Sequence, residues 1–307
     1  MKTYVIAIGG NALESEKAKL DAVLAQISDA IAALVKYGNR VVLVHGNGPQ
    51  IGKIVIQNKL AKEVIESSSI DECGAITQAT IGYTLQKELG NSLRSSGVRK
   101  NIVTVLTQVV VDKNEMDRIE PTKPIGPFYS KEEAESIMKN EDVLYAEDAG
   151  RGYRRVVKSP KPLKILEMDV IRDLLYAGNI VIAGGGGGIP VIEEDEKLTG
   201  VEAVIDKDYT AELIASEIQA DVLILLTNIE YVAINYKKEN QKSLEIVSVE
   251  ELNTYVEEGQ FHVGSMLPKV DAGMRFVNEA EGREAVIGTL SKLQEIIANK
   301  SGTRIVK

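Results

Sequence analysis

The sequence predicts an α/β protein whose mainly parallel sheet is covered by helices on both faces. Short apolar runs alternate along the chain with longer segments of helical periodicity. The runs are apolar almost throughout, as expected of strands that are buried on both faces of a sheet. With 307 residues, 44% of them hydrophobic, the chain can bury a large core as one domain or as two.

The first element is the apolar run "YVIAI", and a helix with one apolar face follows it between Leu20 and Val35. Gly38 closes that helix. The alternation continues with the strand "RVVLV", a helix from Asp71 to Ser96, the strand "NIVTVLTQVVV", a helix from Ile165 to Tyr176, the strand "NIVIA", a helix from Tyr209 to Ile218 and the strand "DVLILL". This order is typical of parallel strands joined by crossover helices.

One segment interrupts the alternation, from Asp112 to Pro162, where charged residues and prolines surround one short predicted helix. It contains "EPTKPIGPFY" and "KSPKP". A surface excursion would explain this composition. Ligands of α/β sheets bind outside the carboxyl ends of the strands, so an insertion after "VLTQVVV" could instead fold over the site as a lid.

The overall charge limits the choice of partners and of compartment. A net charge of -9 and an isoelectric point near 5.1 argue against a nucleic-acid or anionic-membrane surface, because such partners need a basic face. The single cysteine, Cys73, cannot form an intramolecular disulfide. The start "MKTYVIAIGG" has too short an apolar stretch for a signal peptide or a membrane span. We expect a cytoplasmic protein.

The loop "VVLVHGNGPQIGKI", from Val41 to Ile54, nearly matches two nucleotide-binding signatures. A phosphate-binding loop needs four residues between its first glycine and the final Gly-Lys-Ser/Thr. Here five residues separate Gly46 from Gly52, and Ile54 stands where a hydroxyl should be. Gly46, Gly48 and Gly52 are also spaced one residue too widely for the dinucleotide fingerprint. Neither signature explains this loop.

Three glycine loops follow apolar runs, in "IAIGGNAL", "LVHGNGPQ" and "VIAGGGGGIP". Each glycine costs roughly 0.5 to 1 kcal/mol of folding free energy relative to alanine, so the five from Gly184 to Gly188 need a reason. Bare backbone allows phosphate oxygens to approach N–H groups closely. A tight strand-to-helix turn would explain any one loop, but three at the same kind of strand end favour anion binding.

Two lysines stand at predicted helix starts. In "AVIDKDYTAELIA", Lys207 lies between Asp206 and Asp208, which ordinarily indicates a helix N-cap and a solvated lysine. In "GSMLPKVDAGMRF", Pro268 begins a helix and Lys269 lies in its first turn. A cation at a helix N-terminus opposes the helix dipole, so Lys269 indicates an anion nearby unless it simply faces solvent.

These motifs, taken in order, resemble the carbamate kinases of the amino acid kinase superfamily. The resemblance covers nearly the whole chain. Two departures lie in the insertion, where Tyr153 replaces an expected tryptophan and Lys158 an expected proline. The matching motifs are "IAIGGNAL", "HGNGPQIG", "PTKPIGPFY", "EDAGRGYRRVVKSPKP", "GGGGGIPV", "VIDKD" and "GSMLPKV".

The resemblance implies a three-layer αβα sandwich around an open, mainly parallel sheet of eight strands. It implies a single amino acid kinase domain over 1–307, in which 1–183 bind the small substrate, 184–307 bind the nucleotide and about 112–162 form a protruding lid. It also implies a homodimer. The expected activity is reversible phosphoryl transfer between ATP and carbamate in arginine and carbamoyl phosphate metabolism.

The resemblance also assigns site residues. The expected catalytic residues are Lys123, Lys207, Asp208 and Lys269, with Asp208 organising the lysines. Gly9, Gly10, Asn11, Gly46, Asn47 and Gly48 should surround carbamate and the transferred phosphoryl group. The nucleotide should lie near Gly185, Gly186, Gly187, Thr227, Tyr231 and Met266, although core packing would also explain Tyr231 and Met266. Mg²⁺ should be held mainly by ATP or ADP phosphates and water.

The expected chemistry fits what the sequence lacks. Carbamate carries an ionised oxygen that can attack the γ-phosphorus, so no general base is needed, and His45 and His262 are expected to be mainly structural. Amino-acid kinases of the superfamily carry a lysine where this chain has Ala7, and Lys123 would replace its charge. Another acyl-phosphate kinase and a catalytically silent nucleotide-binding module remain as alternatives.

Overall fold

A mainly parallel sheet of eight strands forms the middle of the protein. The computed structural model describes residues 1–13, 17–148 and 150–307. The strand order is β15 (Ile246–Ser248), β17 (Thr303–Val306), β16 (Glu284–Thr289), β12 (Val222–Thr227), β1 (Thr3–Ile8), β2 (Arg40–His45), β9 (Ile180–Ile182) and β3 (Ile102–Thr104). Neighbouring strands are parallel except β16 and β17. The predicted open, eight-stranded sheet is therefore confirmed.

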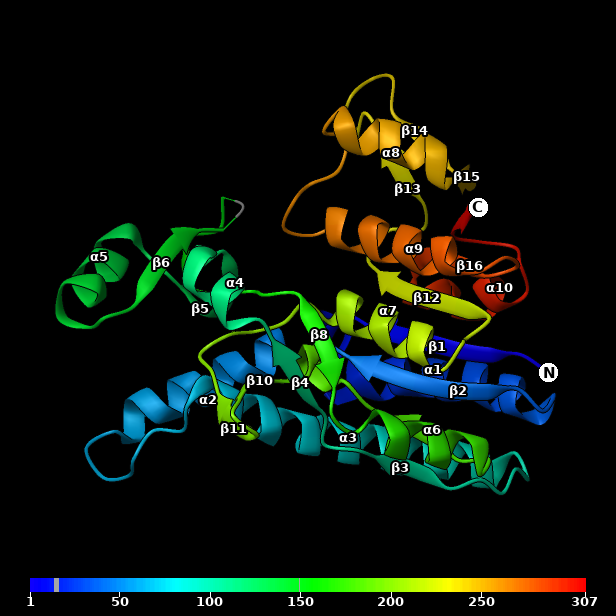
Figure 1. Cartoon of the computed structure of the whole chain (residues 1–307), viewed down its shortest axis with the longest axis horizontal. Coiled ribbons are helices and arrows are strands. Elements are labelled where there is room, and N and C mark those ends of the chain that lie inside the picture. The colour runs from blue at the N-terminus through cyan, green and yellow to red at the C-terminus, as the bar shows by residue number, and fades with distance from the viewer. Residues whose placement is uncertain (14–16, 149) are drawn as a thin grey trace.

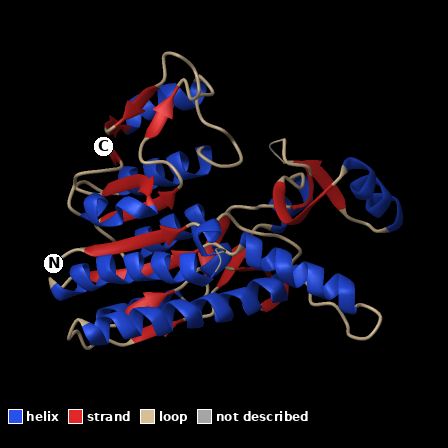
Figure 2. Ribbon diagram, turned by 180° about the vertical axis from the view of Figure 1, so that it is seen from behind, coloured by secondary structure: helices blue, strands red, loops and turns tan. Residues whose placement is uncertain are grey.

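Helices cover both faces of this sheet and make three layers (Figures 1 and 2). The apolar core of one face includes side chains of α6 (Met168–Tyr176), α7 (Lys207–Glu217), α8 (Val249–Glu257) and α9 (Leu267–Glu279). The core of the other face includes α1 (Lys17–Lys36), α3 (Ile70–Ser95) and α10 (Leu293–Ile297). The expected αβα sandwich is confirmed.

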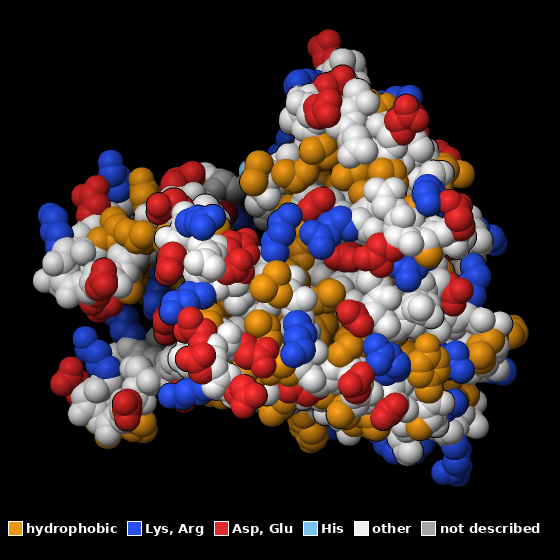
Figure 3. Space-filling view, viewed as in Figure 1, with side chains coloured by type: hydrophobic (Ala, Val, Ile, Leu, Met, Phe, Trp, Pro, Cys, Tyr) orange, Lys and Arg blue, Asp and Glu red, His pale blue; other side chains and the backbone are white. Residues whose placement is uncertain are grey.

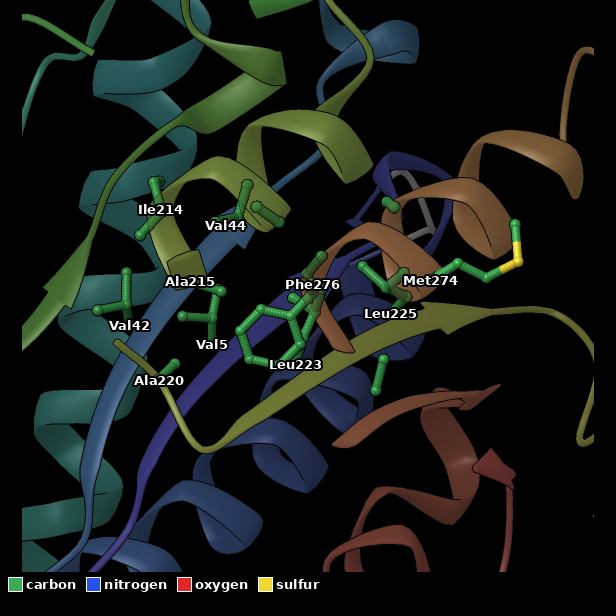
Figure 4. Packing of buried hydrophobic residues seen from close by; sticks show 14 of the residues in the cluster. Val5, Val42, Val44, Ile214, Ala215, Ala220, Leu223, Leu225, Met274 and Phe276 are labelled. Atoms are coloured by element: carbon green, nitrogen blue, oxygen red, sulfur yellow. The ribbon is translucent and has the colours of Figure 1, made fainter. Parts of the chain in front are cut away.

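The apolar run of β1 shows why the central strands need no polar face. Val5 and Ala7 belong to the core under α7 and α9, whereas Ile6 and Ile8 belong to the core under α1 and α3. All four side chains are fully buried. Figure 4 shows Val5 of β1 beside core residues of neighbouring strands and of the two helices above them. Successive residues of a strand point to opposite faces, so an apolar run suits a sheet covered on both sides.

The predicted strand "NIVTVLTQVVV" is in fact two strands in two sheets. β3 ends at Thr104, and β4 (Gln108–Val111) joins a second sheet of order β11 (Lys197–Gly200), β10 (Ile189–Glu194), β4 and β8 (Pro162–Ile165). Thr107 turns the chain between them: its N–H donates to Gln78 and its hydroxyl to the carbonyl of Val105. The single-strand prediction was wrong because these hydrogen bonds satisfy the backbone outside the first sheet.

The predicted helix from Ile165 begins later, at Met168. Ile165 ends β8, pairs with Val109 and is buried in the core. Glu167 precedes the helix and accepts hydrogen bonds from the backbone and side-chain amides of Gln108, at 2.7 and 2.9 Å. Strand pairing therefore displaces the helix start by three residues. In contrast, Asp206 caps α7 as predicted, since its side chain accepts from the backbone N–H of Asp208.

The insertion forms a projecting unit, called here the lid unit, from α4 (Lys113–Arg118) to β7 (Tyr153–Val157). It stands away from the main sheet in Figures 1 and 2. The single short helix predicted between "EPTKPIGPFY" and "KSPKP" is α5 (Lys131–Asn140), and the unit contains α4 as a further helix that was not predicted. Its antiparallel sheet has the order β5 (Lys123–Tyr129), β7 and β6 (Leu144–Glu147). The strands were not predicted because prolines and charged residues interrupt their short apolar pattern.

Two residues that depart from the family motifs lie in this unit. Tyr153 begins β7 and pairs with Tyr129 and Glu147. The Lys158 side chain, just after β7, donates a hydrogen bond to the carbonyl of Met116 in the last turn of α4. A lysine at the carboxyl end of a helix is favourable, because it meets carbonyls that have no partner within the helix. Lys158 thus fastens α4 to the base of the lid unit.

The remaining elements are short 3₁₀ helices, one 14-residue helix and a hairpin. They are η1 (Gly10–Leu13), α2 (Gly48–Ala61), η2 (Gly185–Gly187), η3 (Leu290–Lys292) and the hairpin of β13 (Val232–Ile234) and β14 (Lys242–Leu244). Within the described ranges, no helix is both long and apolar enough to cross a lipid bilayer.

Candidate active site

A cleft of about 1110 Å³ lies at the carboxyl ends of the central strands. Its lining includes residues that directly follow β1, β2, β12 and β16, together with the base of the lid unit and the starts of α7 and α9. Figure 3 shows the molecular surface notched between the lid unit and the main body. This is where a parallel sheet places its ligands, so the elements predicted to carry the site meet in one place.

Asp208 organises the centre of the cleft. Its carboxylate accepts from Lys207 Nζ at 2.9 Å through one oxygen and from Lys269 Nζ at 2.7 Å through the other. The Asp208 side chain is 1% exposed. Asp208 lies in the first turn of α7 and Lys269 in the first turn of α9, and these two helices pack side by side. A buried carboxylate therefore holds two ammonium groups that come from separate helices.

The surroundings perturb both lysines. Burial lowers the pKa of Lys207, and Asp208 only partly opposes this effect. Burial alone would lower the pKa of Lys269 as well, but the nearby Asp208 and Asp206 outweigh it, so that the pKa of Lys269 is raised. Asp208 is thus the nearest anion that stabilises the charge on each lysine, and an anionic ligand in the cleft would share that function.

Asp206 is a site residue that sequence reasoning treated only as a helix cap. One of its oxygens accepts from the backbone N–H of Asp208 at 3.0 Å, and the other accepts from Lys123 Nζ at 2.6 Å. Burial raises the pKa of Asp206, but Lys123, Lys207 and Lys269 together hold it well below its ordinary value. Asp206 therefore joins the lid lysine to the start of α7. The sequence signal that could have identified Asp206 as a site residue is the alternation Asp-Lys-Asp.

The two glycine loops that contain Gly9–Gly10 and Gly46–Gly48 lie backbone to backbone. A Cβ atom at Gly46 would stand 2.6 Å from the backbone nitrogen of Gly10, so neither loop has room for a side chain there. Gly9, Gly10, Gly46 and Gly48 line the cleft. Asn11 belongs to η1, but its side chain lies outside the part of the chain that is described. The two loops present bare backbone to the cleft.

Asn47 lines the cleft but points its amide elsewhere. Its Nδ2 donates to the hydroxyl of Thr77 at 2.8 Å, and that hydroxyl donates to the carbonyl of Gly74. The residue is 3% exposed and directly precedes α2, whose N-terminus meets the cleft at Gly48 and Pro49. Backbone N–H groups at a helix start attract anions. Asn47 therefore fixes the loop that delivers this helix start.

The five glycines from Gly184 to Gly188 have a structural cause that the sequence argument did not consider. A Cβ at Gly185 would overlap His45, one at Gly186 would overlap Asn47, and one at Gly187 would overlap the carbonyl of Ile205. Gly186 has φ of 69° and Gly187 of 94°, a region that disfavours other residues. Gly186 lines the cleft, whereas Gly185 and Gly187 do not. Close packing against His45, Asn47 and Ile205 thus accounts for Gly185, Gly186 and Gly187.

Neither histidine is arranged as a general base. His45 is 1% exposed, its Nδ1 donates to the carbonyl of Gly46, and burial lowers its pKa to about 4. His262 lines the cleft, but its Nδ1 accepts from the backbone N–H of Gly264 and so shapes the turn before α9. Both histidines hold backbone in place.

The expected nucleotide contacts are only partly brought together. Thr227 and Met266 line the cleft, but Tyr231 does not, because the chain turns away after β12 and Tyr231 directly precedes β13. Sequence reasoning also missed the lid residues Arg151 and Arg154, which line the cleft. Other lining residues that it missed are Asn228, Tyr236, Phe261, Thr289 and Ser291. Their common signal is their position just after a strand or just before α9.

The chain and its fold match a known protein family. The family model described as "Amino acid kinase family" matches residues 2–289. N-acetylglutamate synthase of Neisseria gonorrhoeae, in complex with coenzyme A and L-arginine, shares this fold at 17% identity and a TM-score of 0.54. The chain covers 61% of that structure. At this identity the likeness concerns the fold alone.

Proteins that are more similar to this chain identify its group within the family. Carbamate kinase 3 of Staphylococcus aureus strain USA300 is 46% identical, and carbamate kinase of Clostridium perfringens is 45% identical, with 99% of both chains covered in each comparison. The structure of carbamate kinase from Giardia lamblia bound to AMP-PNP has a TM-score of 0.89 at 38% identity, covering 100% of this chain and 98% of that one. The chain therefore belongs to the amino acid kinase family and, within it, to the carbamate kinases.

Proposed function

We propose that this protein catalyses reversible phosphoryl transfer between ATP and carbamate, giving ADP and carbamoyl phosphate. Relatives that carry the name carbamate kinase match the whole chain at about 45% identity. The structural observation that carries the proposal is the pairing of buried Asp208 with Lys207 and Lys269 in the cleft. Lys123 enters the same cleft from the lid unit.

The proposed reaction needs charge neutralisation more than proton transfer. A carbamate oxygen attacks the γ-phosphorus, an O–P bond forms, and the bond from phosphorus to the ADP oxygen breaks. Negative charge spreads over the phosphoryl oxygens during this exchange. Lys123, Lys207 and Lys269 supply positive charge, and the N-terminus of α2 supplies backbone N–H groups. In the reverse direction the same groups stabilise the same transition state.

The substrates are proposed to divide the cleft between the two halves of a single domain spanning 1–307. Residues 1–183, with the lid at about 112–162, would hold carbamate and the transferred phosphoryl group, and residues 184–307 would hold the nucleotide. The bare backbone that the two glycine loops present supports the first assignment. Thr227 and Met266 at the other side of the cleft support the second, with Gly186 between the two halves.

We propose that Mg²⁺ enters with the nucleotide. Among the described residues, the carboxylates that line the cleft are Asp206 and Asp208, and both accept hydrogen bonds from lysines. These carboxylates could orient the ion, but the phosphates and water would supply most of its oxygen ligands. The ion would neutralise charge on the β- and γ-phosphates. No group of three or more potential metal ligands occurs in the part of the chain that is described.

An assay with carbamoyl phosphate, ADP and Mg²⁺ tests the function. ATP formation is expected, and it should disappear when a chelator removes the ion. Acetylglutamate and glutamate should not accept phosphate from ATP, because the relatives that match the whole chain at about 45% identity are carbamate kinases. Robust activity on either amino acid, with none on carbamoyl phosphate, would identify another acyl-phosphate kinase. Tight ADP binding without turnover on any substrate would identify a silent nucleotide-binding module.

We propose that two copies associate through α3 and the sheet edge beside it. β3 is the last strand on that edge of the main sheet. On the α3 surface Ile76 is 42% exposed and Tyr83 is 66% exposed, and Leu106 beyond β3 is 51% exposed. Ile76 and Tyr83 are seven residues apart and so lie on one face of α3, and exposed apolar groups on one face favour a protein interface. Sedimentation should give a dimer of about twice the 33.4 kDa chain mass, and Tyr83→Glu should shift it to monomer. A monomeric wild type would contradict the proposal.

We also propose a cytoplasmic location, where ATP and ADP are available. The absence of a membrane-crossing helix from the described segments is compatible with it. Fractionation of cells should recover the phosphotransferase activity in the cytosolic fraction, and recovery mainly outside the cytoplasm would contradict this location.

A further inference from the structure

The base of the lid unit meets α2 at a contact between two glycines. A Cβ atom at Gly52 of α2 would stand 2.9 Å from the Cα atom of Gly126 and 3.3 Å from its backbone nitrogen and carbonyl carbon. Backbone atoms cannot rotate aside as the end of a flexible side chain can. Gly126 itself has φ of 75°, which disfavours a side chain there. Glycine at position 52 therefore allows β5 to lie this close to α2, whereas a Cβ at Gly126 would meet nothing within 4 Å and is disfavoured only by the backbone angle.

Neighbouring contacts prevent Gly126 from moving sideways. Arg154 of β7 donates from Nε to the carbonyl of Gly126 at 2.9 Å, and its Nη1 contacts Asp148 at 3.1 Å. Ile125 is 1% exposed and packs with Ile51 of α2 in a small apolar cluster. The base of the lid unit is therefore packed against the body of the protein. An atom added next to Gly126 must displace the strand β5.

Lys123 begins the same strand, three residues before Gly126. Its Nζ reaches Asp206 at 2.6 Å. At about 3.3 Å per residue, the two positions are only about 10 Å apart along the strand, so a shift at Gly126 would be felt at Lys123. We propose that Gly52 is a positioning residue, whose contact with Gly126 sets where Lys123 stands over the phosphoryl group. This inference rests on the proposed function, in which Lys123 acts on that group.

The variant Gly52→Ala tests the contact. An added methyl group should push β5 away from α2 and lower kcat for ATP formation by about tenfold to a hundredfold, because small misplacements of a catalytic group have such effects. The KM for ADP should stay unchanged. Gly90→Ala is the matched control, since Gly90 is also a helical glycine but the nearest atom to a Cβ there, at 3.1 Å, belongs to the flexible end of the Arg94 side chain. That variant should keep wild-type kcat.

A double-mutant cycle separates positioning from general damage. If Gly52 acts through Lys123, adding Gly52→Ala to Lys123→Ala should cause no further loss of kcat. An equal fold loss in both backgrounds would overturn the inference, and so would wild-type kcat in a folded Gly52→Ala protein. If Gly52→Ala does not fold, Arg154→Lys replaces it in the same cycle, because lysine lacks the Nε donor that holds Gly126. Full activity of Lys123→Ala would instead contradict the proposed role of Lys123.

Discussion

Asp208→Asn is expected to lower kcat for ATP formation by about a thousandfold, the upper end of the loss seen when one electrostatic group is removed from an active site. The carboxylate contacts the ammonium groups of Lys207 and Lys269 and is 1% exposed. An amide of the same shape removes the charge that holds these cations together. Steady-state kinetics with carbamoyl phosphate and ADP measure the effect.

The same substitution should also reduce stability. Breaking a buried ion pair by removing one partner costs about 3 to 5 kcal/mol, because the remaining charge is left without compensation. Chemical denaturation of Asp208→Asn should therefore give a lower free energy of unfolding than the wild type. Asp173→Asn is a suitable control, since Asp173 lies on the exposed side of α6 and its loss should change neither kcat nor stability.

Combining Asp208→Asn with Lys207→Ala tests the coupling directly. With Lys207 gone, Asp208 has one cation fewer to organise, so the double variant should lose less than the product of the two single losses. A loss equal to that product would show that Asp208 and Lys207 act independently. In that case the 2.9 Å contact between them would be incidental to catalysis.

The parts of this fold that sequence predicts are those fixed by local pattern. β1, β2, β9 and β12 are short apolar runs, and α3 is a long periodic segment with a capping box at Ser69. Each of these signals resides within a few neighbouring residues. β4 is also an apolar run, but its place in a second sheet has no local signal, because β4 pairs with β8 and β10, which are remote in the chain. The strands of this sheet are defined by partners, which a local pattern cannot reveal.

The same distinction between local patterns and remote partners applies to the site residues. Lys207 and Lys269 could be assigned because each lies at a helix start next to a recognisable motif. The role of Asp206 could not, since its partner Lys123 is 83 residues away and comes from the lid unit. The run of five glycines was interpreted as an anion site, but Gly185, Gly186 and Gly187 are also required by packing against His45, Asn47 and Ile205. A run of glycines indicates that other atoms approach the backbone closely, but only the structure identifies those atoms.

Lys123→Ala is expected to lower kcat by about a hundredfold to a thousandfold while leaving the KM for ADP nearly unchanged. The lysine enters the cleft from the lid unit, whereas the candidate nucleotide contacts Thr227 and Met266 lie after β12 and before α9. Its ammonium group is held by Asp206, which directly precedes α7 and lies two residues before Asp208. The effect should therefore fall on the transferred phosphoryl group.

Lys113→Ala supplies the matched control. Lys113 is also a lysine of the lid unit, but its partner Glu194 is exposed, and a surface ion pair of this kind contributes little. Loss of activity in both variants would point to general damage of the lid unit. Unchanged kcat in Lys123→Ala would show that the segment "PTKPIG" lines the cleft but takes no part in phosphoryl transfer. A parallel rise in the KM for ADP would place Lys123 on the nucleotide, and the separation of roles between lid and body would then be wrong.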